Sequence, residues 1–276
     1  MTHDTAPTRT VEAAGVRYAH RRLGVEGPVP LVLLQHFRGT MDHWDPAVVD
    51  GLAADRPVIL FDNRGIGRTS GVTPATVADM ASDAVAFLDA LELPRVDVLG
   101  FSLGGMVAQQ MLFERPERIR RALLVGTGGP GADGMFRPAV VAAATRIPGD
   151  ADSLLELFFQ PTATSQAAGG RYLQRMLARA DREPPATVQT IQAHLAAIRG
   201  WGETNGSVFA RLKRVAQAVL VVNGTHDVMI PSFNAYALSQ QVPNAHLILY
   251  PDAGHGSLFQ YPDGFVHDAL RFLRRE

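Results

Sequence analysis

Short apolar runs alternate with longer segments of helical periodicity along most of this chain. The apolar runs end at Leu34, Phe61, Gly100, Val125, Val222 and Tyr250. Runs of this length are typical of buried strands, and their alternation with helices is typical of a parallel sheet covered on both faces. The pattern therefore predicts an α/β fold with a mostly parallel sheet. Residues 11–23, which turn at Gly15, predict an antiparallel hairpin that opens this sheet.

The alternation of strands and helices stops between about residues 131 and 212. Helical patterning covers residues 152–159, 166–181 and 187–199, and Pro184 and Pro185 separate the last two segments. About eighty residues of short helices cannot bury a core of their own, so they need another core beneath them. We therefore predict a core of residues 1–130 and 213–276, with residues 131–212 inserted as a helical cap. Residues 262–274 fit a closing amphipathic helix on the sheet.

A Gly-x-Ser-x-Gly sequence lies between one of the predicted strands and a predicted helix. It reads Gly100-Phe101-Ser102-Leu103-Gly104 and follows the apolar run 96–99. Such a pentapeptide forms a sharp, strained turn that lifts the serine hydroxyl above the end of the sheet. The two glycines remove side chains that would collide with the neighbouring strand and helix. Ser102 is therefore the candidate nucleophile.

A serine hydroxyl needs a base to take its proton, and the base needs an orienting carboxylate. Asp227 follows the apolar run 218–222 and His255 follows the run 246–250, so both fall at the same predicted sheet edge as Ser102. The alternative for Asp227 is to cap the helix that begins near Pro231. Asp252 and Asp133 are weaker rivals for the acid. The first lies three residues before His255, and the second falls at the start of the insertion.

On these residues the chain resembles the α/β-hydrolase superfamily, and within it the single-domain bacterial esterases and cofactor-free haloperoxidases. The segments 35–39 (Gln-His-Phe-Arg-Gly) and 62–67 (Asp-Asn-Arg-Gly-Ile-Gly) match the same family. The resemblance implies that Ser102 is the nucleophile, His255 the general base and then acid, and Asp227 the carboxylate that orients His255. It also implies that the helical insertion covers the active site and that no cofactor is used.

The resemblance further implies an oxyanion hole made of the backbone N–H groups of Leu103 and Phe37. His36 stands where relatives usually have the glycine that precedes the second donor. Two interpretations of His36 remain open. Histidine tolerates unusual φ values better than most residues, or its ring places a polar group near the site.

Large apolar side chains in the insertion and in the core predict a mostly apolar substrate pocket. The candidates are Phe136, Phe158, Phe159, Met176 and Trp201 from the insertion, and Trp44, Met229 and Leu258 from the core. Packing explains any single one of them better than substrate contact does. Arg38 is the one charged candidate, and exposure to solvent is its alternative.

Composition narrows the class of protein. The chain has 276 residues, 46% of them hydrophobic and 19% charged, with a formal net charge of −1. That charge gives no global attraction to nucleic acid or to an anionic membrane. The absence of cysteine excludes disulfides and cysteine-ligated metals, and we expect no metal and no cofactor. The polar first ten residues and the lack of a run of roughly 20 apolar residues predict a cytoplasmic protein without a signal peptide or membrane span.

These observations predict a serine hydrolase that cleaves a carboxylic ester or lactone of an apolar small molecule through an acyl-enzyme. The alternatives are a cofactor-free perhydrolase or a C–C bond hydrolase that uses the same three residues, and a small-molecule receptor without catalysis. Epoxide hydrolases and haloalkane dehalogenases are disfavoured, because those relatives carry aspartate where Ser102 stands. The sequence assigns no oligomeric state.

Overall fold

The computed structural model of the chain describes residues 1–146, 151–204 and 210–274. Within them, one eight-stranded sheet has the order β1-β2-β4-β3-β5-β6-β7-β8. β2 pairs antiparallel with β1 and β4, and all the other neighbours pair in parallel. This confirms the predicted α/β class and its opening hairpin. The strands are β1 (Arg9–Ala13), β2 (Val16–Leu23), β3 (Leu31–Leu34), β4 (Val58–Phe61), β5 (Val96–Phe101), β6 (Ile119–Val125), β7 (Ala218–Gly224) and β8 (Ala245–Tyr250).

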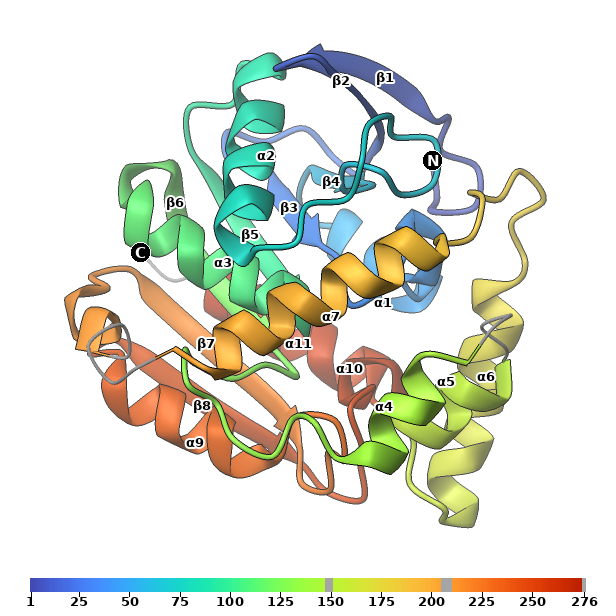
Figure 1. Cartoon of the computed structure of the whole chain (residues 1–276). Helices are drawn as coiled ribbons and strands as arrows, with labels where there is room; N and C mark the ends of the chain where they lie inside the picture. The colour runs from blue at the N-terminus through green and yellow to red at the C-terminus, as the bar shows by residue number, and fades with distance from the viewer. Residues whose placement is uncertain (147–150, 205–209, 275–276) are drawn as a thin grey trace.

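Helices cover both faces of the sheet (Figure 1). One face packs against α2 (Val77–Ala90), α3 (Leu103–Glu114) and α9 (Ser232–Gln241). The opposite face packs against α1 (Pro46–Ala53) and α11 (Pro262–Leu273), and the second of these matches the predicted closing helix closely. Because both faces are covered, the central strands β3 to β7 are buried almost throughout, as their apolar sequences require. Three shorter helices complete the core: η1 (Met41–His43), η2 (Pro116–Arg118) and α10 (Ser257–Gln260).

The register of the parallel strands brings the ends of the central strands together. Gly100 at the end of β5 pairs with Leu34, and Phe101 pairs with Val125. β7 and β8 end together, with Gly224 paired to Tyr250. The loops that follow these strands therefore meet along one edge of the sheet, where open α/β sheets place their sites.

Helices make up most of the described segment between β6 and β7. They are α4 (Pro138–Ala144), α5 (Ala151–Phe158), α6 (Ala163–Met176), α7 (Val188–Gly202) and the short η3 (Ala210–Arg214). In Figure 1, α7 crosses in front of the sheet, while α4, α5 and α6 lie together beside it. The sequence pattern does not predict α4, and the predicted helix 166–181 ends earlier, at Met176. Beyond Met176, the side chains of Arg179 and Glu183 bind residues of the core. The division into a core and a cap stays a prediction.

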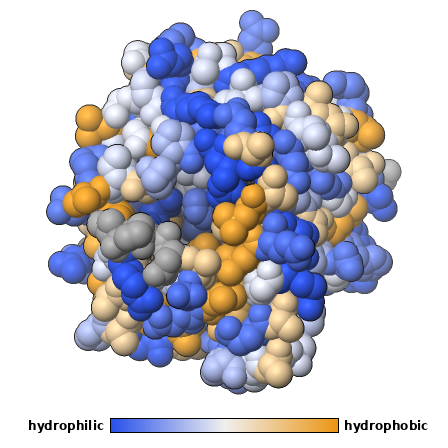
Figure 2. All heavy atoms as spheres, turned by 90° about the vertical axis from the view of Figure 1, so that its right-hand side faces the viewer, coloured by the Kyte–Doolittle hydropathy of each residue, from blue (hydrophilic) through white to orange (hydrophobic). Residues whose placement is uncertain are grey.

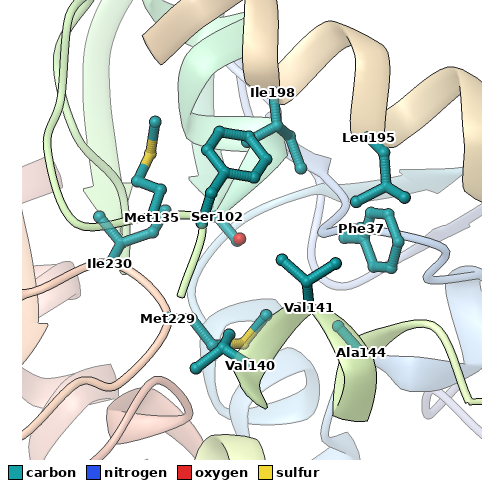
Figure 3. A pocket seen from close by; sticks show the side chains of 11 residues that line it. Phe37, Ser102, Met135, Val140, Val141, Ala144, Leu195, Ile198, Met229 and Ile230 are labelled. Atoms are coloured by element: carbon teal, nitrogen blue, oxygen red, sulfur yellow. The ribbon is translucent and has the colours of Figure 1, made fainter. Parts of the chain in front are cut away.

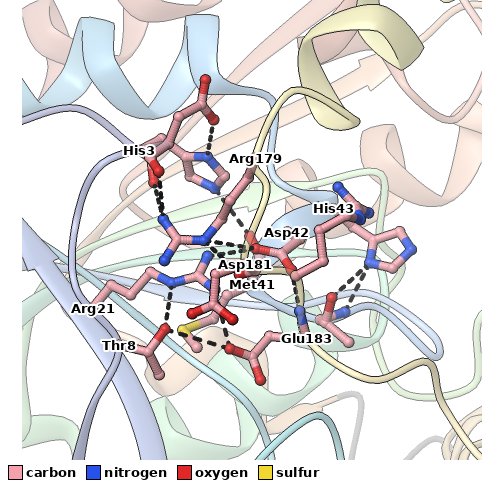
Figure 4. Close-up of polar contacts among 12 residues, drawn as sticks. His3, Thr8, Arg21, Met41, Asp42, His43, Arg179, Asp181 and Glu183 are labelled. Carbon is pink, nitrogen blue, oxygen red and sulfur yellow. Dashed lines mark hydrogen bonds and ion pairs between the residues drawn. The ribbon is translucent and has the colours of Figure 1, made fainter.

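A buried ionic network joins that connecting segment to the core (Figure 4). The guanidinium of Arg21 on β2 donates to Asp42 Oδ1 at 2.5 Å and to Glu183 Oε1 at 3.0 Å. The backbone N–H of Glu183 donates in turn to Asp42 Oδ2 at 2.5 Å. Arg179 donates to the carbonyl oxygen of His3, which adds the N-terminal segment. The network thus fixes the stretch between α6 and α7 against β2 and η1.

The side of the molecule that lies at the right of Figure 1 is mostly hydrophilic, and a stretch of apolar residues lies near its middle (Figure 2). No helix in the described ranges has both the length and the apolar character that a membrane crossing requires.

Candidate active site

Ser102 occupies a strained turn between β5 and α3. Its φ of 56° and ψ of −116° lie outside the ordinary regions for a residue with a side chain. The glycines on either side permit this turn. A Cβ on Gly104 would stand 2.0 Å from the carbonyl oxygen of Leu34, and a Cβ on Gly100 would stand 2.4 Å from that of Gly104. The local sequence therefore builds the turn that the Gly-x-Ser-x-Gly pattern predicts.

Asp227 and His255 are brought together at the same edge of the sheet. His255 Nδ1 lies 2.8 Å from Asp227 Oδ2, and both side chains are buried. Since a carboxylate oxygen accepts, the proton of this hydrogen bond belongs to Nδ1, and in the neutral ring the lone pair is on Nε2. Asp227 Oδ1 accepts from the N–H groups of Met229 and Ile230, at 2.8 and 2.9 Å. Asp227 therefore orders its own loop and the histidine, and it does not cap α9.

The two rival carboxylates have other partners. Asp252 accepts from Thr162 Oγ1 of the inserted segment, at 2.8 and 3.0 Å to its two oxygens. Asp133 Oδ1 accepts from the N–H of Gly134 at 2.7 Å. Within the described ranges, Asp227 is the carboxylate bound to His255.

Ser102 and His255 line the same cavity without a hydrogen bond between them in the described part of the chain. His255 Nε2 is buried and has no partner there. The Ser102 oxygen points into the adjoining cavity (Figure 3). Asp227 and His255 are therefore joined by a hydrogen bond, whereas Ser102 and His255 are not joined by one in the described part of the chain. Such contacts are often long in enzymes without bound substrate.

Two adjoining cavities, of about 40 and 360 Å³, meet at Ser102, Phe37, Ala144 and Met229. The smaller cavity is apolar (Figure 3). Its other lining residues are Met135, Phe136, Val140, Val141, Leu195, Ile198 and Ile230. The larger cavity mixes apolar residues of α5 with polar groups. Its polar lining residues are His36, Arg38, His43, Ser153 and His255.

The loop after β3 is held from both sides at the peptide between Phe37 and Arg38. His36 Nδ1 lies 2.8 Å from the carbonyl oxygen of Phe37. On the other side, the N–H of Arg38 donates to Nδ1 of His194 on α7, at 3.0 Å. The left-handed residue of this loop is Arg38, with φ of 52°, and His36 is not among the described residues with positive φ. Tolerance of an unusual φ therefore does not explain His36.

The three histidines around this loop are neutral at pH 7. Burial, with a smaller contribution from the neighbouring His43, lowers the pKa of His36 well below its usual value. Burial also lowers the pKa of His43 to about 4 and that of His194 to about 3. Each ring therefore offers one N–H donor and one bare nitrogen acceptor.

Four of the nine predicted pocket residues line the two cavities, namely Arg38, Phe136, Phe158 and Met229. Arg38 does not simply face solvent, because its Nη1 donates to the carbonyl oxygens of Ala144 and Arg146, each at 2.9 Å. That contact ties the loop after β3 to the end of α4.

The other five predicted pocket residues pack in the hydrophobic core and are absent from both cavity linings. Trp201 stacks on Phe113 of α3 and donates from Nε1 to the carbonyl oxygen of Gly128 at 3.1 Å. The remaining four lie in the cluster on the α1 and α11 side of the sheet. They are Trp44, Phe159, Met176 and Leu258. These large side chains pack the inserted helices against the core.

Sequence analysis missed His43 and His194. His194 lies among the buried positions of α7, between Ile191 and Ala197. A histidine within an apolar helical stripe is the signal that would have found it. His43 has a weaker signal, because it belongs to the one-turn helix η1 and its ring accepts from the N–H of Thr40.

Comparison with known proteins gives consistent results over nearly the whole chain. The model of the family described as "alpha/beta hydrolase fold" matches residues 29–262. The structure of an alpha/beta hydrolase fold protein from Chitinophaga pinensis is similar over 100% of both chains, with 40% identity and a TM-score of 0.95. The structure of Est816, described as an N-acyl homoserine lactone degrading enzyme, is 28% identical, covers 95% of this chain and 99% of its own, and has a TM-score of 0.76. A candidate non-heme bromoperoxidase, BpoC of Mycobacterium tuberculosis, is 28% identical over 88% of this chain and 93% of its own length.

Proposed function

The chain belongs to the alpha/beta hydrolase fold family, and we propose that it is a serine hydrolase that cleaves a carboxylic ester or lactone of a small, largely apolar molecule. One observation carries the proposal. A buried histidine, bound at 2.8 Å to a buried aspartate, lines the same cavity as the serine of the strained turn. Serine, base and orienting acid are the groups that acyl transfer requires.

In the proposed first step, the Ser102 side chain turns toward His255 Nε2. His255 takes the hydroxyl proton while Ser102 Oγ attacks the substrate carbonyl carbon. Asp227 stays ionised and holds the imidazolium that forms. The tetrahedral oxyanion is stabilised by the N–H groups of Leu103, at the start of α3, and Phe37. His255 then gives its proton to the leaving alkoxide, and an acyl-Ser102 ester remains.

The second step returns the enzyme to its starting state. His255 Nε2 takes a proton from a water molecule, and the resulting hydroxide attacks the acyl carbon. The oxyanion forms again against the same two N–H groups. When it collapses, His255 returns the proton to Ser102 Oγ and the carboxylic acid leaves. A lactone follows the same course, and its alcohol stays attached to the released acid.

The two cavities support a neutral substrate with an apolar part. The smaller cavity accepts only a small apolar group, and the larger one has room for the rest of the molecule. Arg38 Nη1 already donates to two carbonyl oxygens of the protein, so this nitrogen is not available to bind an anionic group of a substrate. The likeness to the lactone-degrading Est816 supports a lactone as well as an open ester.

A perhydrolase is the second candidate, and the similarity to the candidate bromoperoxidase BpoC favours it. In that reaction hydrogen peroxide attacks the same acyl-Ser102 in place of water and releases a peracid. Product analysis with and without added hydrogen peroxide distinguishes the two outcomes.

Hydrolysis of a panel of neutral esters and lactones, followed by acid release at constant pH, tests the proposal. We expect turnover of at least one class, with loss of turnover in Ser102→Ala. A folded wild-type protein that hydrolyses nothing in the panel would contradict it.

A further inference from the structure

Met135 and Phe136 form a partition between the small cavity and a groove on the outside of the protein. Both residues line the small cavity beside Ser102, and both also line an outer groove of about 580 Å³. Among the described residues that line the groove, neither Ser102 nor Phe37 appears, so the groove is separate from the site itself. The two side chains therefore stand where the small cavity and the groove come closest.

Helix α7 supports this partition from the side of the groove. The guanidinium carbon of Arg199 lies 5.6 Å from the centre of the Phe136 ring, and a Cβ on Gly202 would stand 2.9 Å from Met135 Cε. Arg199 and Gly202 both line the outer groove. Ile198 of the same helix lines the small cavity instead. The partition side chains are thus held with residues of the groove on one side and the cavity on the other.

The small cavity has room for only a short apolar chain. Its volume is about 40 Å³, and roughly 10–15 Å³ of such space holds one water-sized group. A chain of about three carbons therefore fills it. Apart from Ser102, the described residues that line it are all apolar, so a polar group would find no partner there.

The position of Ser102 divides a bound ester between the two cavities. Ser102 lines both of them, and its oxygen points into the smaller one (Figure 3). An ester carries one group on its carbonyl carbon and another on its ester oxygen. When Ser102 attacks, one group lies toward the small cavity and the other toward the cavity of about 360 Å³. The size of the small cavity therefore limits one of the two groups.

We propose that Phe136 is a specificity-determining residue that closes the small cavity, so that an open ester substrate has one short side of about three carbons or fewer. The short side is the acyl group or the alcohol, and the larger cavity takes the other side. Removal of the Phe136 ring joins the small cavity to the outer groove and gives a longer chain a path. This inference rests on the proposed function and narrows its substrate class.

Three esters test the size limit on the wild-type protein. Methyl hexanoate is short on its alcohol side, hexyl acetate is short on its acyl side, and hexyl hexanoate is long on both. Gas chromatography gives kcat/KM for each at equal concentrations below the solubility of hexyl hexanoate. We expect at least one short-sided ester to exceed hexyl hexanoate by about tenfold or more, since surplus methylenes in an apolar pocket cost at least that. The better short-sided ester identifies the group that the small cavity takes. Equal values for all three would overturn the proposal.

Phe136→Ala should remove this discrimination. We expect kcat/KM for hexyl hexanoate to rise about tenfold relative to that for the better short-sided ester. Phe136→Leu removes less of the side chain and should give a smaller rise, and it replaces Phe136→Ala if thermal melting shows that the latter is unfolded. An unchanged ratio in a folded Phe136 variant would overturn the assignment.

Phe113→Ala is the matched control for loss of a phenylalanine ring. Phe113 is also partly buried and also lies beneath an arginine, with the guanidinium carbon of Arg211 4.5 Å from the ring centre. In the described part of the chain, it belongs to neither cavity lining. Phe113→Ala should keep the discrimination against hexyl hexanoate. A change equal to that in Phe136→Ala would contradict a specific role for Phe136.

The Ser102→Ala variant distinguishes failure of this inference from failure of the proposed function. If the folded wild-type protein hydrolyses none of the three esters, equilibrium dialysis measures their affinities for Ser102→Ala. Tighter binding of a short-sided ester then removes the hydrolase and keeps the size limit, whereas equal affinities or no binding remove both. Hydrolysis of all three esters with equal kcat/KM keeps the hydrolase and removes the size limit.

Discussion

His194 on α7 accepts a hydrogen bond of 3.0 Å from the backbone N–H of Arg38, a residue 156 positions earlier in the chain. This contact joins the inserted helices to the loop that carries the proposed oxyanion donor. The His36 ring contacts the carbonyl oxygen of Phe37. These two contacts hold both ends of the peptide group between Phe37 and Arg38, which is next to the Phe37 N–H. The geometry of the proposed oxyanion hole therefore depends on His194, a residue of the segment between β6 and β7.

Removal of the His194 acceptor should slow the chemical step. In His194→Leu the N–H of Arg38 loses its partner, and we expect kcat for ester hydrolysis to fall about tenfold, less than the loss of an oxyanion donor itself. In His194→Asn the amide oxygen stands near the place of Nδ1 and should restore most of kcat. Steady-state kinetics of the two variants check this. Equal kcat values for His194→Leu and His194→Asn would contradict a positioning role.

Acid should destabilise the fold through the buried histidines. The pKa of His194 is about 3 in the folded protein against 6.5 as its ordinary value, so the unfolded chain binds the proton first as the pH falls. Stability is therefore unaffected above about pH 6.5 and falls progressively between 6.5 and 3. His194→Asn removes this dependence, so its Tm should fall less steeply than that of the wild type between pH 7 and 4. Parallel Tm curves would show that His194 does not contribute.

Asp227→Asn tests the orienting acid. The amide oxygen can still accept from the N–H groups of Met229 and Ile230, but the side chain no longer offers two acceptors. His255 then loses the partner that fixes its tautomer, and kcat should fall by roughly 10⁴ with folding largely intact. Steady-state kinetics and circular dichroism are the measurements. Near-normal turnover would mean that another group orients His255.

Loss of the buried arginine should weaken the attachment of the segment after α6. Arg21→Met leaves Asp42 and Glu183 buried without their shared cation, and we expect a loss of about 3–5 kcal/mol in the free energy of unfolding. Arg22→Met on the same strand is the matched control. Its ion pair with Glu26 is exposed, so we expect a change of less than about 1 kcal/mol. Urea unfolding of both variants measures the difference, and equal losses would contradict the network's role.

Local sequence was sufficient to place the fold and the three candidate catalytic residues along the chain. The turn at Ser102 depends on Gly100 and Gly104, which act within a few residues of it. Asp227 and His255 each follow an apolar strand, and the parallel sheet brings those strand ends together.

The cavity lining could not be predicted in the same way, because it depends on how the inserted helices pack. Trp201 and Phe136 are both large and apolar, yet Trp201 packs against Phe113 while Phe136 lines the small cavity. The role of His194 is similarly non-local, since its partner Arg38 lies in another element. Hydrophobic patterning identifies a buried face but does not say which residue the face meets.

Intact mass after reaction with a fluorophosphonate tests the central claim, that Ser102 is an activated nucleophile, most directly. Ser102→Ala is the control, and its melting temperature establishes that the variant is folded. The account predicts a single covalent adduct on the wild-type protein that is absent from Ser102→Ala. No adduct on folded wild-type protein, or an adduct that persists in Ser102→Ala, would contradict it.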